Sequence, residues 1–410
     1  MKTILVLPVW YPTEDNPMSG SFFKEQIELL SQKYNFIVLK YHRGEAYKSN
    51  KAYELTLDRE YQVDEDCGVI KEYTATSFES TFTYALERVK SALNARKGRI
   101  PGVGIYHSEG YNRMIAAAVN GIAAELSKDE EIALVYGISA MGVAYESYLM
   151  AKYLQVPLIF SEHGPFPYPG TTISDTDKLA LEAADDFLAI SHDKVRQIML
   201  QNIKLSHITY VGNLIDENRF ICDRINHEVP TILIVAANSF FKNYDMFFET
   251  LEKLNNKTSN PYHVIIAGYN ANKSYCDSAE SLEKRVKKSS FSDKVELIPA
   301  VAREDMSSLY NRADVFVMTS IQEGQPVSAL EAACCGLPVF ATRCGGVEDY
   351  VDESMGRIVD ITDSESLSEY LRQYIDKEIT FDANHIRQTV VSQFGCEAYL
   401  DTIASSFDKS

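Results

Sequence analysis

Short apolar segments alternate with helix-like segments along most of this chain, and this alternation constrains the fold more than any other feature. Apolar runs at residues 4–9, 132–136 and 158–160 fit buried strands, and residues with helical spacing follow them. Strands that alternate with helices are typical of a parallel sheet covered by helices on both faces. The first half of the chain is therefore expected to form one α/β domain.

The same series occurs a second time. Further strands are expected at 231–235, 263–267 and 315–318, each close to a helical segment. We therefore predict two doubly wound, Rossmann-like domains, 1–207 and 208–389. Ligands of such sheets bind beyond the carboxyl ends of the strands. The polar and glycine-containing loops of both halves fall there, which predicts one cleft with the two domains facing across it.

Composition narrows the class of protein. With 410 residues and a formal net charge of −18, the chain does not fit a nucleic-acid binder that uses a large basic surface. The seven cysteines include no C-x-x-C pair, so neither a disulfide framework nor a zinc site is indicated, and a reducing cytoplasm fits best. The apolar N-terminus lacks a small-residue cleavage site and is interpreted as a strand, with a signal peptide as the alternative.

Two glutamates eight residues apart form the most specific motif. Pro326 suits a helix start and Gly336 a helix end, so Glu323 is expected in the loop before the helix and Glu331 on it. Unpaired backbone N–H groups and the helix dipole favour anions at such a loop. The pattern predicts a nucleotide-sugar cradle. The alternative is a buried helix start with a capping carboxylate.

Three further residues lie at expected strand ends. Gly20 would let the backbone approach a phosphate, His163 could donate a hydrogen bond to a sugar hydroxyl, and Lys242 could neutralise a diphosphate. The alternatives are a plain turn glycine, a histidine satisfied by packing, and a solvated surface lysine. The pair Gly345-Gly346 after another strand is read as a turn.

With these motifs in place, nearly the whole chain resembles the family-4 retaining glycosyltransferases of the GT-B fold. The resemblance rests on Trp10-Tyr11-Pro12 and Gly20, on Glu162-His163-Gly164, and on the Glu-x7-Glu spacing that ends at Glu331. It implies an N-terminal acceptor-binding domain and a C-terminal donor-binding domain. It also implies that the last helix, within 390–410, crosses back to the first domain.

The resemblance assigns roles to individual residues. Glu331 would hold the donor ribose, Lys242 the diphosphate, and Gly20 would approach that diphosphate from the other domain. His163 would contact the transferred sugar. The loop residues that would line the sugar site are Glu323, Gly324, Gln325, Pro326 and Val327.

The chain departs from the family pattern at two places. Many relatives carry an arginine five residues before the diphosphate-binding lysine, and here that position is Ala237. Either another cation replaces this arginine, with Arg303 and Arg343 as candidates, or the diphosphate charge is neutralised less completely. At Gly324-Gln325-Pro326 many relatives carry Gly-Phe-Gly, which we interpret as a subtype difference.

The predicted activity is transfer of a sugar from a nucleoside-diphosphate donor to an acceptor hydroxyl with retention, without a cofactor or a metal. By resemblance, the acceptor is a sugar or a lipid-linked sugar in bacterial surface polysaccharide or glycolipid synthesis. The protein would be cytoplasmic, with peripheral membrane contact through Arg88, Lys90, Arg96, Lys97 and Arg99, or these residues are simply solvated. A non-catalytic nucleotide-sugar-binding protein is one alternative function, and an epimerase or phosphorylase on the same fold is another.

Overall fold

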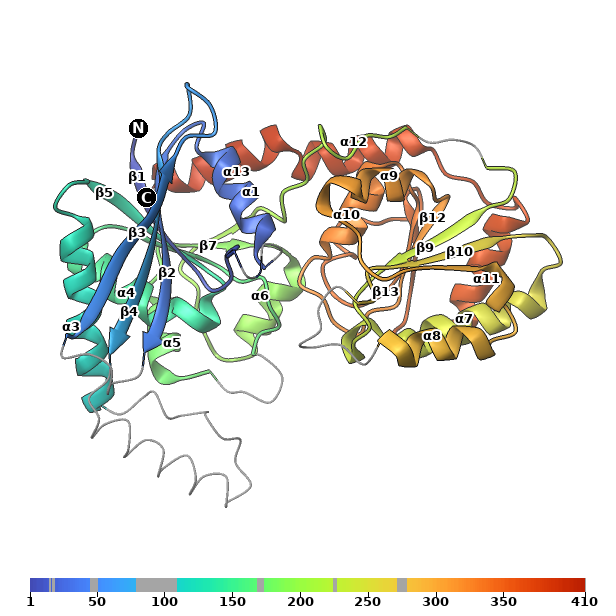
Figure 1. The fold of residues 1–410 in the computed structure, drawn as a ribbon, viewed down its shortest axis with the longest axis horizontal. Coiled ribbons are helices and arrows are strands. Elements are labelled where there is room, and N and C mark those ends of the chain that lie inside the picture. Colours follow the sequence, from blue (N-terminus) through green and yellow to red (C-terminus); the bar gives the residue numbers. More distant parts are fainter. Residues whose placement is uncertain are drawn as a thin grey trace, which may run out of the picture. The chain divides into compact units, whose positions relative to one another are not determined.

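The computed structural model divides into two compact units, residues 1–211 with 400–410 and residues 212–399 (Figure 1). It describes residues 1–14, 16, 19–44, 51–78, 109–167, 173–223, 227–270 and 279–409. The helix expected at 82–96 and the basic residues proposed for membrane contact lie outside these ranges. No helix within the described ranges has both the length and the apolar character needed to span a bilayer.

The first unit is built on an eight-stranded sheet with the order β3-β4-β2-β1-β5-β6-β7-β8. All neighbouring strands are parallel except β3 and β4, which pair antiparallel. The strands are β1 (Thr3–Pro8), β2 (Asn35–Gly44), β3 (Tyr53–Tyr61), β4 (Ile70–Phe78), β5 (Ile132–Ile138), β6 (Leu158–Ser161), β7 (Asp186–Ala189) and β8 (Ile208–Tyr210).

Helices cover both faces of this sheet because successive strand residues point to opposite sides. Leu5 and Leu7 of β1 share a core cluster with residues of α3 and α4. On the other face, Phe407 packs its ring against Tyr136 of β5. The helices of the unit are α1 (Ser21–Leu30), α3 (Glu109–Leu126), α4 (Ala140–Leu154), α5 (Asp175–Glu182), α6 (His192–Met199) and the end of α13 (Cys396–Lys409).

The second unit has a six-stranded, fully parallel sheet with the order β11-β10-β9-β12-β13-β14. Its strands are β9 (Thr231–Val235), β10 (His263–Ala267), β11 (Val295–Ile298), β12 (Val315–Met318), β13 (Val339–Thr342) and β14 (Gly356–Val359). Its helices are α7 (Tyr244–Lys257), α8 (Ala279–Lys288), α9 (Met306–Asn311), α10 (Val327–Cys334), α11 (Ser364–Ile375) and α12 (Ala383–Phe394). Short 3-10 turns also occur at Phe240–Lys242 (η3), Ser292–Lys294 (η4) and Arg303–Asp305 (η5).

Two separate cores on the two faces of the second sheet confirm that it is doubly wound. Leu233 and Phe316 pack in one cluster with residues of α9, α10 and α12. Their neighbours Ile232 and Val315 pack in the other cluster with residues of α7, α8 and α11. The strands are therefore buried on both sides, which explains why they appear in the sequence as continuous apolar runs.

Each sheet contains one place where the strand order reverses, and such switch points are the usual ligand sites of open α/β sheets. In the first unit it lies between β1 and β5, and in the second between β9 and β12. The loop after β1 contains Gly20, and the loops after β9 and β12 contain Lys242 and Glu323. The strand order alone thus brings the last two loops to one place.

The unit boundaries differ from the expected domain limits by a few residues. β8 pairs with β7 in the first sheet, although a limit at 207/208 would assign it to the second domain. The second unit begins at Gly212, and residues 390–399 also belong to it. The helix α13 begins in the second unit, and its residues from Leu400 on belong to the first.

Candidate functional site

The switch point of the second unit brings the side chains of Lys242 and Glu323 together. Lys242 Nζ lies 2.6 Å from Glu323 Oε1, and both side chains remain partly exposed, at 29% and 16%. Backbone contacts hold the two loops in place: the Thr319 hydroxyl donates to the Lys242 carbonyl at 3.0 Å, and the Ile321 amide donates to the Phe241 carbonyl at 2.8 Å. An accessible cation and a carboxylate are therefore fixed at the carboxyl edge of this sheet.

The start of α10 adds unpaired donors beside this pair. Pro326 is the N-cap residue, so the helix begins at Val327, as the sequence predicts. No side chain caps this helix start, and its first turn contains no acidic residue. The first amides of a helix have no acceptor within the helix, and the dipole is positive at this end. The helix start can therefore receive the oxygens of a phosphate or a sugar.

A turn that contains Gly346 packs against the loop before α10. The Glu323 amide donates to the Cys344 carbonyl at 2.7 Å. Gly346 has φ +72°, and a Cβ there would lie 2.1 Å from the Gly324 carbonyl oxygen. A side chain at position 346 would therefore displace the Gly324 backbone. This turn, which the sequence marks only weakly, is a packing requirement of the loop that contains Glu323.

The side chain of Gln325 is hydrogen-bonded within the protein. Its Oε1 accepts the Asn213 amide, and the Asn213 Nδ2 donates to the Gln325 carbonyl at 2.9 Å. Both side chains are buried. The expectation that Gln325 lines the sugar site can thus apply to its backbone N–H, while its side chain ties the loop to the connection after β8.

Glu331 is buried one turn further along α10, and both of its carboxylate oxygens have partners. Oε1 contacts the Arg303 guanidinium, and Oε2 accepts from the Tyr310 hydroxyl at 2.8 Å. Burial, followed by the Glu331 charge, raises the pKa of Tyr310 well above its usual value. Glu331 is therefore a fixed, buried carboxylate, oriented by a guanidinium and a hydroxyl group.

The two replacement cations suggested for position 237 each have a carboxylate partner. The Arg303 guanidinium binds Glu331 and lies over the Phe220 ring, 5.1 Å from its centroid. Arg343 is 61% exposed and lies 3.6 Å from Asp360. Lys242 is thus the cation that the described structure places against Glu323.

In the first unit, Gly20 and His163 both lie next to Phe23. Gly20 caps α1 with φ 67°, and a Cβ there would lie 2.4 Å from the Trp10 carbonyl oxygen, so this position requires glycine. The His163 ring meets the Phe23 ring edge-on at 4.7 Å, and its Nε2 lies 3.0 Å from the Ser161 hydroxyl. Tyr136 donates to the same hydroxyl at 2.9 Å.

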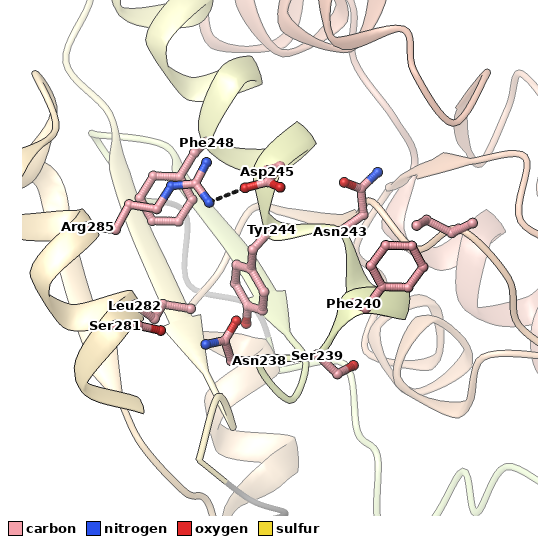
Figure 2. A pocket seen from close by; sticks show the side chains of 11 residues that line it. Asn238, Ser239, Phe240, Asn243, Tyr244, Asp245, Phe248, Ser281, Leu282 and Arg285 are labelled. Carbon is pink, nitrogen blue, oxygen red and sulfur yellow. Dashed lines mark hydrogen bonds and ion pairs between the residues drawn. The ribbon is translucent and has the colours of Figure 1, made fainter. Parts of the chain in front are cut away.

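A separate cavity of ≈ 320 Å³ opens between η3, α7 and α8 of the second unit (Figure 2). The Tyr244 and Asn238 side chains face it, and Arg285 is held by Asp245 and by the face of Phe248 (Figure 2). None of the site residues predicted from the sequence lines it. It lies on the α7 side of the sheet, whereas α10 packs on the other side.

Within the described ranges, one cluster has the donor atoms of a metal site: Asp216, Glu217 and Cys396. Its carboxylates already accept backbone N–H groups. Glu217 accepts from the Cys396 amide at 2.8 Å, and Asp216 accepts from the Asn218 amide at 3.0 Å. These contacts explain the cluster as capping of chain turns.

Comparisons with known proteins identify a family whose sequence model matches part of this chain. Residues 217–389 match the sequence model of the family glycosyl transferases group 1. A phosphatidylinositol N-acetylglucosaminyltransferase component of Arabidopsis thaliana is 23% identical over 57% of this chain and 52% of its own length. An N,N'-diacetylbacillosaminyl-diphospho-undecaprenol alpha-1,3-N-acetylgalactosaminyltransferase of Campylobacter jejuni is 28% identical over 40% of this chain and 43% of its own.

The fold extends further than the sequence similarity. The matched region spans about half the length of the Arabidopsis protein. The crystal structure of HepE of Anabaena in complex with UDP and glucose aligns over 100% of both chains, with a TM-score of 0.67 and 13% identity. The chain thus has the GT-B fold, and its second unit carries the sequence pattern of glycosyl transferases group 1.

Proposed function

We propose that this protein is a glycosyltransferase that moves a sugar from a nucleoside-diphosphate sugar to an acceptor hydroxyl. One observation carries the proposal: an accessible Lys242–Glu323 pair lies beside an uncapped helix start at the switch point of the second unit. A bound diphosphate would need a cation and free N–H donors, and a sugar would need a carboxylate as acceptor. The matched family and the aligned fold support the same activity.

In this proposal the donor replaces contacts that the protein makes with itself. The diphosphate takes over Lys242, and Glu323 is then free to accept hydrogen bonds from hydroxyls of the transferred sugar. The Val327 and Ser328 amides at the start of α10 bind phosphate or sugar oxygens. Glu331 accepts a ribose hydroxyl while Arg303 and Tyr310 keep its carboxylate oriented. In the first unit, Gly20 would approach the diphosphate and His163 the sugar.

The proposed reaction retains the configuration of the sugar. The bond between the anomeric carbon and the diphosphate oxygen breaks, and the acceptor oxygen bonds to that carbon on the same face. The acceptor proton goes to the leaving diphosphate, so no protein nucleophile is needed. Lys242 and the α10 dipole stabilise the negative charge that develops on the leaving group. The remaining rate enhancement comes from holding the donor and the acceptor in position. We propose that no metal or cofactor takes part.

For the acceptor, we propose a sugar or a lipid-linked sugar of bacterial surface polysaccharide or glycolipid synthesis. The name of the Campylobacter jejuni relative contains such a lipid-linked saccharide. A protein that acts on lipid-linked acceptors would work in the cytoplasm at the inner face of the membrane. The basic residues between positions 88 and 99 are the proposed contacts with anionic lipids.

The test is turnover by the wild-type protein with a panel of UDP- and GDP-sugars and with free and lipid-linked sugar acceptors. We expect release of nucleoside diphosphate that depends on the acceptor, continues in the presence of EDTA, and gives an NMR-defined product with retained configuration. Tight nucleotide binding without turnover across the panel would instead support a non-catalytic binding protein. Inverted product would contradict the mechanism.

A further inference from the structure

The first unit contains a buried lysine and a buried glutamate that the proposed chemistry does not use. Lys194 of α6 is 0% exposed, and Glu162, in the loop after β6, is 1% exposed. Burial lowers the pKa of Lys194 and raises that of Glu162, and the opposite charge of each partner counteracts both shifts. Asp193 also faces Lys194. These charges sit directly beside His163.

The two side chains bind the backbone of the same glycine, one at its amide and the other at its carbonyl. Glu162 Oε1 accepts the Gly164 amide at 2.7 Å, and Lys194 Nζ donates to the Gly164 carbonyl. Glu162 Oε2 also accepts the Met141 amide of α4 at 3.1 Å. His163 directly precedes Gly164 in the chain. The backbone on the carboxyl side of His163 is therefore fixed by side-chain contacts from the interior of the unit.

The contacts continue to Phe166, two residues further along the loop. Lys194 Nζ also donates to Gln197 Oε1 at 3.0 Å, and this oxygen accepts the Phe166 amide at 3.1 Å. Gln197 is held in turn through its Nε2, which donates to Asp193 at 2.6 Å. Helices α4 and α6 are thus both connected to the five residues that follow β6.

Stability does not explain such a pair. Two buried opposite charges are often no more stabilising than apolar side chains of similar volume, because both charges lose their water. What a buried pair does provide is a single conformation for the groups that it binds. Here those groups are the amide and the carbonyl of Gly164, which directly follows a histidine at the carboxyl edge of the sheet.

We propose that Lys194 and Glu162 are positioning residues that hold the His163 loop in the geometry needed for contact with the transferred sugar. This inference rests on the proposed function. Neither residue touches the substrate, and both act through the backbone of Gly164. The proposal predicts that loss of the pair lowers transfer only as far as His163 contributes to it.

The test is a double-mutant cycle on the acceptor-dependent transfer rate. We expect Lys194→Met, and the paired Glu162→Gln/Lys194→Met, to lower kcat/KM by about 10- to 100-fold, the effect of a small misplacement at a reacting centre. In the His163→Ala background the same changes should cause little further loss, because coupled residues are non-additive. Lys33→Met removes an exposed lysine of the first unit that is paired with Asp401 at 3.0 Å, so it is the matched control and should change nothing.

The outcomes separate the possible failures. Equal losses with and without His163 would show a merely structural role and overturn the inference, as would unchanged transfer in the paired variant. Nucleoside-diphosphate affinity should stay at the wild-type value in all folded variants, because the second unit is untouched. A readout without substrate is the NMR signal of the His163 ring, which should move in Lys194→Met and not in Lys33→Met. If the wild-type protein shows no turnover, the proposed function fails and the inference with it, whereas a variant effect absent from an active enzyme contradicts the inference alone.

Discussion

The two units each hold a lysine and a glutamate near the carboxyl edge of the sheet, but the two pairs differ in exposure. Lys242 and Glu323 of the second unit are partly exposed and contact each other directly at 2.6 Å. Lys194 and Glu162 of the first unit are almost completely buried, and both bind the backbone of Gly164.

This difference assigns the two pairs to different tasks. An accessible pair can exchange its partner for a charged ligand at little cost, because water and ligand reach both groups. A buried charge that loses its partners is left uncompensated inside the protein. We infer that the second unit recognises the charged part of a donor, whereas the first unit uses its charges internally and presents glycine, aromatic and imidazole groups.

The largest expected effect comes from removing the carboxylate of the exposed pair. Glu323→Gln keeps the size of the side chain but removes the charge that accepts from sugar hydroxyls. We expect kcat/KM for transfer to fall about 100-fold or more, the range for a lost transition-state contact. The matched control is Glu296→Gln, an exposed glutamate of the same unit paired with Arg312, which should retain activity. Equal activity of both variants would contradict the role of Glu323.

The next effect tests the support beneath the donor loop. In Gly346→Ala, the alanine has a left-handed φ and its Cβ clashes with the Gly324 carbonyl. In Gly268→Ala, φ is similar at +74°, but the nearest atom to the new Cβ lies 3.8 Å away, which is an ordinary contact distance. We expect Gly268→Ala to lower the free energy of unfolding by about 1–2 kcal/mol. Gly346→Ala should cost on the order of 3 kcal/mol or more, measured by urea unfolding. Similar losses in both variants would show that the clash is relieved without cost.

A smaller effect is expected from the partner of Glu331. Tyr310→Phe removes the 2.8 Å hydrogen bond to that carboxylate, and bonds to charged groups contribute about 1.5–3 kcal/mol. We expect this loss in unfolding free energy together with weaker donor binding in calorimetry. Tyr374→Phe loses a 2.9 Å bond to the Asp314 carbonyl in the same unit, and should lower stability alone. An equal loss of donor affinity in both variants would contradict the role of Tyr310 in donor binding.

The smallest expected effect appears only at alkaline pH and concerns how the free energy of unfolding changes with pH. The pKa of Tyr310 is raised by burial, so the folded protein keeps this proton while the unfolded chain loses it above a pKa of about 10. The stability contribution is complete below that pH and falls by about 1.4 kcal/mol per pH unit above it. Unfolding of Tyr310→Phe should show a correspondingly shallower decline between pH 10 and 11. An identical slope would mean that Tyr310 ionises in the folded state.

The parts of the fold that follow local rules could be predicted from the sequence. The strands β1, β9, β10 and β12 are continuous apolar runs because both of their faces are buried. The start of α10 follows from Pro326, and its end from Gly336, which has φ +79°. Those signals depend on the residues themselves, so a single sequence contains them.

Features that depend on distant partners were missed. The antiparallel β3 was not expected, because its burial pattern is mostly exposed and gives no alternation. The strand β14 and helix α12 were also missed. The assignment of β8 needed its pairing with β7, which no local pattern reveals.

In the candidate site, too, local features could be predicted from the sequence, whereas contacts between distant residues could not. Sequence placed Lys242 and Glu323 in two loops, but their contact depends on the order of β9 and β12 in the sheet. The engagement of Gln325 with Asn213, and of Arg303 with Glu331, joins residues 112 and 28 positions apart. Lys194 was missed because a lysine in a short polar helix normally indicates an exposed surface.

The most direct test of the central claim is binding of nucleoside diphosphates to the exposed pair. The thermal midpoint of unfolding should rise with UDP or GDP for the wild-type protein, because a ligand that binds only the folded state stabilises it. Lys284→Met, which removes an exposed lysine paired with Glu280 at 2.5 Å, should show the same rise. Lys242→Met should fold and show little or none. An equal rise in all three proteins would contradict the assignment of the diphosphate to Lys242.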